Sequence, residues 1–175
     1  MTSIVINIGN TNIRFGLFNN ENCDISWILN TKPYRTSDEL QMQFMMMYQT
    51  HKINAENIDK IIIGSVVPQL TYDISRAIQK IHVKKPVIVD RNTHSGVQPK
   101  SRQMGTDIYA NLVSAHHLYP DGKKIIFDFG TALTASCISP LSPVRTEISR
   151  RSHCSAASRM IRASGPTICW WVIRR

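Results

Sequence analysis

The sequence lacks several features that would place it in a familiar class at once. Its 175 residues contain no apolar run of about 18 residues, the length that a membrane-spanning helix needs. The start, MTSIVINIG, has neither the basic segment nor the cleavage site of a signal peptide. The four cysteines are far apart and form no C-x-x-C pair, which argues against a zinc site or a disulfide framework. These absences predict a protein of the reducing cytoplasm with no membrane partner.

The formal net charge of +9 would suit a nucleic-acid binder, but the charge is unevenly distributed. Residues 1–139 hold 14 Lys or Arg and 11 Asp or Glu, a net of +3, whereas residues 140–175 hold seven Arg and one Glu, a net of +6. The basic excess is therefore mostly a property of the C-terminal segment, and the sequence argues against nucleic acid as a partner.

The first third of the chain reads as a β-meander followed by a helix. Strands are predicted over 3–8, 13–18 and 25–29, with a turn over 19–24 between the second and third. Thr36-Ser-Asp-Glu fits a capping box, which predicts a helix from about residue 37. The Met-rich run 45–47 in that helix is interpreted as core filler.

The middle of the chain alternates strands with helices. Residues 61–67 (IIIGSVV) predict a buried strand, Pro68 the first position of a helix, and 86–90 a further strand, so that the unit is a parallel right-handed crossover. After a polar loop over 91–104, a helix is predicted near 106–118 and a buried strand over 125–130. His116 and His117, near the end of that helix, are interpreted as surface residues.

A weak internal repeat links the two ends of this pattern. INIGNT (6–11) and FDFGTALT (127–134) share the order apolar, polar, apolar, Gly, polar, with Asn7 and Asp128 as the first polar members. Two similar strand-and-turn units predict two related domains that face a shared cleft.

The C-terminal segment breaks the pattern. Residues 140–175 show no helical or strand period, contain no Lys and no Asp, and are dominated by Arg and Ser. We interpret the segment as a basic tail that is poorly ordered, and as the product of a shifted reading frame that begins around 135–140. Reading the gene in its other two frames tests that hypothesis.

The Gly9-Asn10-Thr11-Asn12 turn could bind phosphate. Gly and Asn tolerate the left-handed conformations that let several backbone N–H groups converge on one anion, and Thr adds a hydroxyl. The sequence contains no G-x-x-x-x-G-K-[ST], so this is not a Walker-type loop. An ordinary polar hairpin turn explains the same residues, and this motif alone does not decide between the two.

Two aspartates are candidates for chemistry. Asp128 stands between Phe127 and Phe129 in a buried-type strand, where a carboxylate needs a cation, a wet cleft, a salt bridge or an edge position. Asp107 lies in the first turn of a predicted helix, where an acid stabilises the helix dipole and needs no further role. Its functional interpretation is a general base that accepts a hydroxyl proton.

Taken together, four motifs resemble the type III pantothenate kinases, the Bvg accessory factor family. The motifs are INIGNTNIRFGLF, IIIGSVVPQL, MGTDIYAN and IIFDFGTALT, in the family's order, over roughly residues 3–134. The resemblance implies an α/β chain with the ribonuclease-H-like, actin-like ATPase fold. The function that it implies is ATP-dependent phosphorylation of pantothenate to 4'-phosphopantothenate in coenzyme A biosynthesis. It also implies a cytoplasmic homodimer that uses Mg²⁺ and K⁺ or NH₄⁺.

The resemblance also assigns residues. Asp107 matches the catalytic proton acceptor, and the segment Gly105, Thr106, Asp107 and Ile108 matches the pantothenate site. Asp128 matches the monovalent-cation ligand. The ATP site corresponds to Asn7, Ile8, Gly9, Asn10, Thr11, Asn12, Ile13, Arg14 and Thr131.

Three departures from the family pattern predict weakened activity. Asn7 replaces an Asp, and Mg²⁺ prefers a carboxylate or ordered water to an amide. Ile108 replaces an Arg that could hold the pantothenate carboxylate by a bidentate contact. The strands, Gly-rich segment and helices that follow in the family are not visible after about residue 135.

The predicted organisation is therefore a complete N-terminal domain and a truncated second domain. The ranges are 1–104 for the N-terminal domain, 105–139 for a linking helix and the first strand of the second domain, and 140–175 for the tail. The leading function is a pantothenate kinase with impaired activity. The alternative is a catalytically inactive remnant or accessory protein that binds a nucleotide or a protein partner.

Overall fold

The computed structural model describes residues 1–90, 92–93, 95–99, 104–129, 133–139 and 142–147. The chain divides into two compact units, and the first of them contains Met1–Asp90. The strands and helices of the first unit are β1 (Thr2–Ile8), β2 (Asn12–Asn19), β3 (Asn22–Asn30), α1 (Ser37–Thr50), the 3₁₀ turn Ala55–Asn57, β4 (Lys60–Ser65), α2 (Pro68–Ile81) and β5 (Val87–Val89). Those of the second unit are α3 (Thr106–Leu118), β6 (Lys124–Phe129), β7 (Leu133–Ser139) and β8 (Ser142–Glu147).

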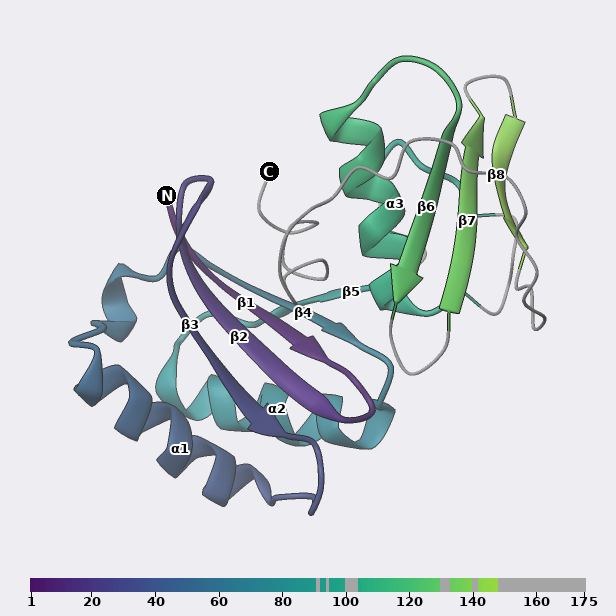
Figure 1. The fold of residues 1–175 in the computed structure, drawn as a ribbon. Coiled ribbons are helices and arrows are strands. Elements are labelled where there is room, and N and C mark those ends of the chain that lie inside the picture. Colours follow the sequence, from purple (N-terminus) through teal and green to yellow (C-terminus); the bar gives the residue numbers. More distant parts are fainter. Residues whose placement is uncertain (91, 94, 100–103, 130–132, 140–141, 148–175) are drawn as a thin grey trace. The chain divides into compact units, whose positions relative to one another are not determined.

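The first unit is built on a five-stranded sheet of order β3-β2-β1-β4-β5 (Figure 1). β1, β2 and β3 are antiparallel neighbours, which confirms the predicted meander. The turn between β2 and β3 is shorter than the predicted 19–24, because the strands end at Asn19 and resume at Asn22. Asn20 provides the tight reversal by adopting a φ of 53°, a value that asparagine tolerates.

β4, α2 and β5 form the predicted parallel crossover. β1 pairs with β4 and β4 with β5, both in parallel. β4 ends at Ser65, two residues earlier than predicted, because Val67 caps α2 and Pro68 occupies its first turn. The parallel pairing of β1 with β4 places the carboxyl ends of these two strands side by side.

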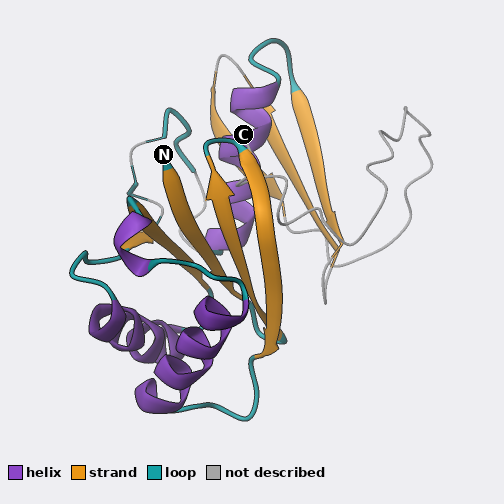
Figure 2. Ribbon diagram, turned by 90° about the vertical axis from the view of Figure 1, so that its left-hand side faces the viewer, coloured by secondary structure: helices purple, strands orange, loops and turns teal. Residues whose placement is uncertain are grey.

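Both helices of the first unit pack against the same face of its sheet (Figure 2). Because strand side chains alternate between faces, every second residue of β1, β2 and β4 enters this core over the paired stretch of these strands. The core residues on β1, β2 and β4 are Ile4, Ile6, Ile8, Ile13, Phe15, Ile61 and Ile63. From the helices, Leu40, Phe44 and Ile74 meet them. The opposite face of the sheet is therefore the one that carries Asn7, Arg14 and Gly64.

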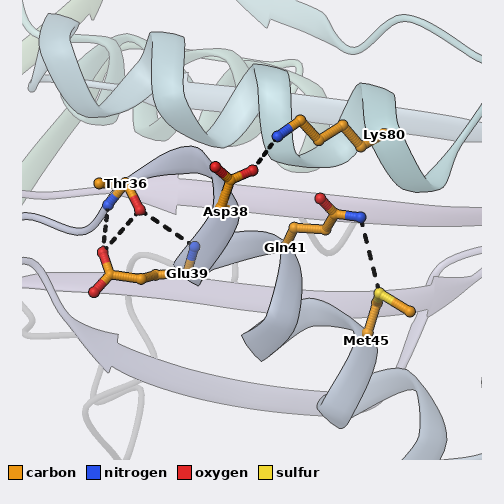
Figure 3. A network of polar contacts seen from close by, with 6 residues as sticks. All are labelled: Thr36, Asp38, Glu39, Gln41, Met45 and Lys80. Carbon is orange, nitrogen blue, oxygen red and sulfur yellow. Dashed lines mark hydrogen bonds and ion pairs between the residues drawn. The ribbon is translucent and has the colours of Figure 1, made fainter.

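The start of α1 is fixed by the predicted capping box (Figure 3). The Thr36 N–H donates to Glu39 Oε2 at 2.7 Å, and the Glu39 N–H donates to Thr36 Oγ1 at 3.4 Å. An ion pair between Asp38 and Lys80 then joins α1 to α2.

The interpretation of 45–47 as core filler is wrong for two of its three residues. Met45 and Met46 are 53% and 67% exposed, and only Met47 packs against the core.

The second unit places α3 against a three-stranded antiparallel sheet of order β6-β7-β8. Leu112 on α3 and Ile138 on β7 are buried in its small core, together with Val97 from the preceding loop. The helix was predicted over the same residues as α3, and β6 lies one residue before the predicted 125–130. Tyr109 ties the loop to α3, because its hydroxyl donates to the Thr93 carbonyl at 2.7 Å.

The internal repeat corresponds to a pair of antiparallel strands in each compact unit. In the first, Asn7 pairs with Arg14 and Ile8 with Ile13. In the second, Asp128 pairs with Thr134 and Phe129 with Leu133. The two polar residues of the repeat thus occupy the same place, one residue before the last paired residue of the first strand of each pair.

The predicted boundary after residue 104 differs from the division into compact units, which falls after Asp90. Of the predicted tail, Ser142–Glu147 form β8 and pair antiparallel with β7. The prediction of poor order for residues 148–175 lies outside the described residues.

None of the helices in the described part of the chain has both the length and the apolar composition to span a membrane.

Candidate functional site

The turn between β1 and β2 is closed by its own backbone. The Gly9 N–H donates to the Asn12 carbonyl at 2.9 Å, so this amide is used within the turn. A Cβ atom at position 9 would lie 3.1 Å from the Asn12 oxygen, closer than the backbone there readily accepts. Asn10 and Thr11 are exposed at the tip. The close approach accounts for glycine at position 9 and leaves two residues that can meet a ligand.

Thr31, which follows β3 directly, holds this turn from one side. Its hydroxyl donates to the Gly9 carbonyl at 2.7 Å, and its backbone N–H donates to the Thr11 carbonyl at 2.9 Å. Thr31 is 1% exposed. One buried residue therefore fixes two carbonyl groups of the predicted phosphate loop.

The remaining residues of the predicted ATP site divide between the two faces of the sheet. Ile8 and Ile13 are fully buried in the core below the turn, so only their backbone could meet a ligand. Asn7 lies on the opposite face, in register with Arg14 on β2 and Gly64 on β4. Among the described residues, nothing lies within 4 Å of the position that a Cβ at Gly64 would occupy. In the part of the chain that the structure describes, space is therefore free beside Gly64 on the face that carries Asn7, near the carboxyl ends of β1 and β4. Ligands commonly bind at the carboxyl ends of parallel strands in α/β folds.

The second group of predicted residues lies at the start of α3. Gly105 is the N-cap residue, and Asp107 is in the first turn. Asp107 Oδ1 accepts a hydrogen bond from the Ile108 N–H at 2.8 Å. An acidic side chain here is stabilised by the amino end of the helix, as its position in the sequence predicted. That role and a role as proton acceptor are compatible.

Asp128 lies near Asp107 in the same compact unit. Burial is the main factor that raises the pKa of Asp128, and the negative charge of Asp107 raises it further. Asn111 opposes both effects, because its Nδ2 donates to Asp128 Oδ2 at 3.1 Å. The side chain of Asn111 is buried and follows Asp107 by one helical turn, so both project from one side of α3. The structure therefore assembles two carboxylates and an amide.

Ile108 has a structural role that the sequence did not reveal. Its side chain is partly buried and packs against the core formed by Val97, Leu112 and Ile138. An arginine at this position would have to leave that contact in order to place its guanidinium in solvent or on a ligand.

Among the described residues, no three His, Cys, Asp or Glu side chains form a group that could hold a metal ion. Thr131, the remaining predicted ATP contact, lies outside the described residues.

The interpretation of the two histidines as surface residues holds for His117, which is exposed, whereas the Nδ1 atom of His116 is buried.

Sequence reasoning missed two residues of this arrangement, Thr31 and Asn111. Asn111 could have been found, because it belongs to the MGTDIYAN motif and follows Asp107 at the spacing that aligns side chains on a helix. Thr31 gives no such signal, since its contact with the turn depends on the pairing of β2 with β3.

Solved structures similar to this chain have low sequence identity to it. They include a ROK hexokinase from Thermus thermophilus (12% identity, TM-score 0.48, covering 82% of this chain and 47% of the other). A ROK family glucokinase from Streptomyces griseus, in complex with glucose and AMPPNP, has 13% identity and a TM-score of 0.47 and covers 85% and 48%. A Ppx/GppA family member from Aquifex aeolicus has 13% identity and a TM-score of 0.44 and covers 83% and 49%. The chain spans about half the length of these proteins.

The family comparison is more specific. The model of the type III pantothenate kinases matches residues 3–142, a range that contains all four motifs and both groups of site residues. This match agrees with the α/β topology described above, and the chain has the predicted ribonuclease-H-like, actin-like ATPase fold. The chain belongs to the type III pantothenate kinase family.

Proposed function

We propose that this chain transfers the γ-phosphoryl group of ATP to the terminal hydroxyl of pantothenate, and that Asn7 and Ile108 slow the reaction. The product is 4'-phosphopantothenate, on the route to coenzyme A. The observation that carries the proposal is the family match over residues 3–142, which includes Asp107 at the start of α3.

In the proposed reaction Asp107 accepts the proton of the pantothenate hydroxyl. The hydroxyl oxygen then forms a bond to the γ-phosphorus while the bond from that phosphorus to the β-γ bridging oxygen breaks, and ADP leaves. Phosphoryl transfer requires mainly positioning and charge stabilisation from the protein. The exposed tip of the Gly9–Asn12 turn would hold the phosphates, and Thr131 would add an ATP contact.

Asp128 is proposed to bind K⁺ or NH₄⁺. Its carboxyl is half-buried and lies near a second carboxylate, so a cation beside it would offset both effects that disfavour its ionised form. A monovalent cation bound there would supply positive charge near the transferred phosphoryl group. Asn111 donates to this carboxylate without cancelling its charge, which suits a cation site better than Lys or Arg would.

The two departures from the family act on different ligands. Asn7 offers an amide where a carboxylate would favour Mg²⁺, so weaker binding of Mg²⁺-ATP is expected. Ile108 contributes an apolar contact to the core and offers no partner to the carboxylate of pantothenate. Both departures favour the alternative function, in which the chain is an inactive remnant that binds nucleotide or a protein partner. The proposed location is the cytoplasm and the proposed assembly a homodimer, both from the family.

The deciding experiment incubates the purified chain with ATP, Mg²⁺, K⁺ and pantothenate and measures phosphopantothenate by mass spectrometry. We expect Asp107→Asn to lower the rate by about 10²- to 10⁴-fold, the usual contribution of a general base. Asp121→Asn, an exposed acid in a turn of the same compact unit, is the matched control and should leave the rate unchanged.

The variants Asn7→Asp and Ile108→Arg, alone and combined, locate the defect. Faster turnover in Asn7→Asp with an unchanged pantothenate KM would show that the activity is limited by the binding of Mg²⁺-ATP rather than by that of pantothenate. If neither the natural chain nor the combined variant forms phosphopantothenate, the kinase proposal is wrong. Retained ATP binding by calorimetry would then favour the remnant.

A further inference from the structure

Thr31 is the one described residue outside the Gly9–Asn12 turn that holds two of its carbonyl groups. Its hydroxyl bonds to the Gly9 carbonyl and its amide to the Thr11 carbonyl, at 2.7 and 2.9 Å. The side chain is 1% exposed, so solvent does not compete for these bonds. Thr31 cannot touch a ligand at the exposed tip, and any effect that it has on a ligand must act through the turn.

Because the peptide bond is planar, the contact of Thr31 with the Gly9 carbonyl also fixes the direction of the next amide, that of Asn10. In a trans peptide the C=O and the following N–H point in opposite directions. When the Thr31 hydroxyl holds the Gly9 carbonyl, the N–H of Asn10 must therefore point away from Thr31. Among the described residues, the Asn10 amide donates to no backbone oxygen, and Asn10 is exposed.

Two other amides of the turn, those of Gly9 and Asn12, are less available to a ligand. The Gly9 N–H is bonded to the Asn12 carbonyl. The bond from the Thr31 N–H to the Thr11 carbonyl points the following amide, that of Asn12, away from β3 and back across the turn. Asn10 thus provides the backbone donor whose direction depends on the hydroxyl of Thr31.

We propose that Thr31 is a positioning residue of the phosphate site, whose hydroxyl directs the Asn10 N–H toward a phosphate oxygen of the bound nucleotide. The inference rests on the proposed function for the identity of the ligand, and it adds a residue that neither the family match nor the motifs assign. A donor aimed in advance loses less entropy on binding than one that must reorient. Its loss should therefore weaken the binding of polyphosphate rather than that of adenosine.

The test compares three variants by calorimetry with ATP, tripolyphosphate and adenosine. Thr31→Val keeps the shape and removes the hydroxyl, and it should weaken ATP and tripolyphosphate by about tenfold, equivalent to about 1.4 kcal/mol. Thr31→Ser keeps the hydroxyl and should restore most of the affinity. Thr71→Val is the matched control, because the Thr71 hydroxyl also donates to a backbone carbonyl, that of Val67 at the N-cap of α2, at 2.9 Å.

Amide NMR of ¹⁵N-asparagine-labelled protein gives a second readout that a general loss of stability would not move. Tripolyphosphate should shift the Asn10 amide in the natural chain, in Thr31→Ser and in Thr71→Val, and not in Thr31→Val. If valine is not accommodated, Thr31→Ala provides the same comparison. An Asn10 amide that responds equally in Thr31→Val overturns the inference, as does equal affinity for tripolyphosphate.

The outcomes separate this inference from the proposed function. Tripolyphosphate binding that depends on the Thr31 hydroxyl, without phosphopantothenate formation, supports the inference and contradicts the kinase. If phosphopantothenate forms and Thr31→Val binds tripolyphosphate as tightly as the natural chain does, the kinase proposal is supported and the inference about Thr31 is wrong. A natural chain that binds neither ATP nor tripolyphosphate contradicts both.

Discussion

The hydroxyl of Tyr48 lies 2.8 Å from Nε2 of His82, and this buried hydrogen bond joins α1 to the end of α2. Both side chains are less than a tenth exposed. His82 also bonds to the backbone of Ala55, which leaves Nε2 to accept the proton of Tyr48. The two helices that cover one face of the sheet are therefore connected by a buried polar contact.

This contact predicts a loss of stability in mild acid. Burial is the main factor that lowers the pKa of His82, and the positive charge of Lys84 lowers it further. The unfolded chain therefore binds a proton at a higher pH than the folded chain does. The contribution of His82 to the free energy of unfolding is complete above the unfolded pKa of 6.5 and falls as the pH drops through the lower folded value. Denaturant unfolding at a series of pH values measures it.

Two variants isolate the effect. His82→Leu should remove the part of the pH dependence that begins near 6.5, and the part below about pH 4, which reflects carboxylates such as Asp38, should remain. Tyr48→Phe should cost about 1–3 kcal/mol, because it leaves the buried Nε2 without a donor. An unchanged pH profile in His82→Leu would contradict the assignment.

The first turn of α1 offers a second test of stability. Thr36 and Glu39 satisfy each other's backbone amides, so Thr36→Ala should lower the free energy of unfolding by about 1 kcal/mol. Thr36→Ser keeps the hydroxyl and serves as the control, with a change well below that of alanine. Equal losses in the two variants would show that the methyl group of Thr36, rather than its hydroxyl, stabilises the helix.

Asn111 provides a third test, this time in the second compact unit. Asn111→Leu removes the amide that donates to Asp128, whose pKa is already raised by burial and by Asp107. The half-buried carboxylate should then cost about 1–3 kcal/mol in unfolding free energy at neutral pH. The cost should become smaller as the pH falls and Asp128 is protonated. A cost that does not vary with pH would indicate that leucine disturbs the packing of α3 instead.

The elements of the fold were predictable because local signals and tertiary packing agree. The capping box at Thr36, Pro68 at the start of α2 and the alternation in β2 each stabilise the element that they predict. The Met-rich run failed for a physical reason. Methionine is usually buried, so residue type alone favoured the core, and the orientation of α1 on the sheet instead leaves Met45 and Met46 facing solvent.

The site was predictable where its residues lie in one short segment and not where they are brought together by pairing. The Gly9–Asn12 turn and Asp107 are visible as motifs, since their chemistry depends on neighbours in the chain. The contact of Thr31 with Gly9 requires the register of β3 on β2, and that of Asn111 with Asp128 requires α3 on β6. The packing of Ile108 in the core was hidden for the same reason.

The two glycines beside the proposed phosphate site, Gly9 and Gly64, should respond differently to substitution, because a side chain has no room at the first and open space at the second. A Cβ at position 9 would press on the Asn12 carbonyl, so Gly9→Ala should destabilise the fold by about 1 kcal/mol. A Cβ at position 64 meets no described atom within 4 Å, and glycine weakens a strand by about 0.5–1 kcal/mol relative to alanine. Gly64→Ala should therefore leave the fold intact or stabilise it.

The same Gly64→Ala variant should nevertheless lose affinity for ATP. Its methyl group would project from the face that carries Asn7, into space that a nucleotide at the carboxyl ends of β1 and β4 would need. Gly64→Val should lose more affinity than alanine does, although valine suits a strand. Thermal unfolding and calorimetry with ATP separate the two effects. Unchanged ATP affinity in Gly64→Val would place the nucleotide away from this edge, because a ligand that approaches Asn7 cannot avoid the added side chain.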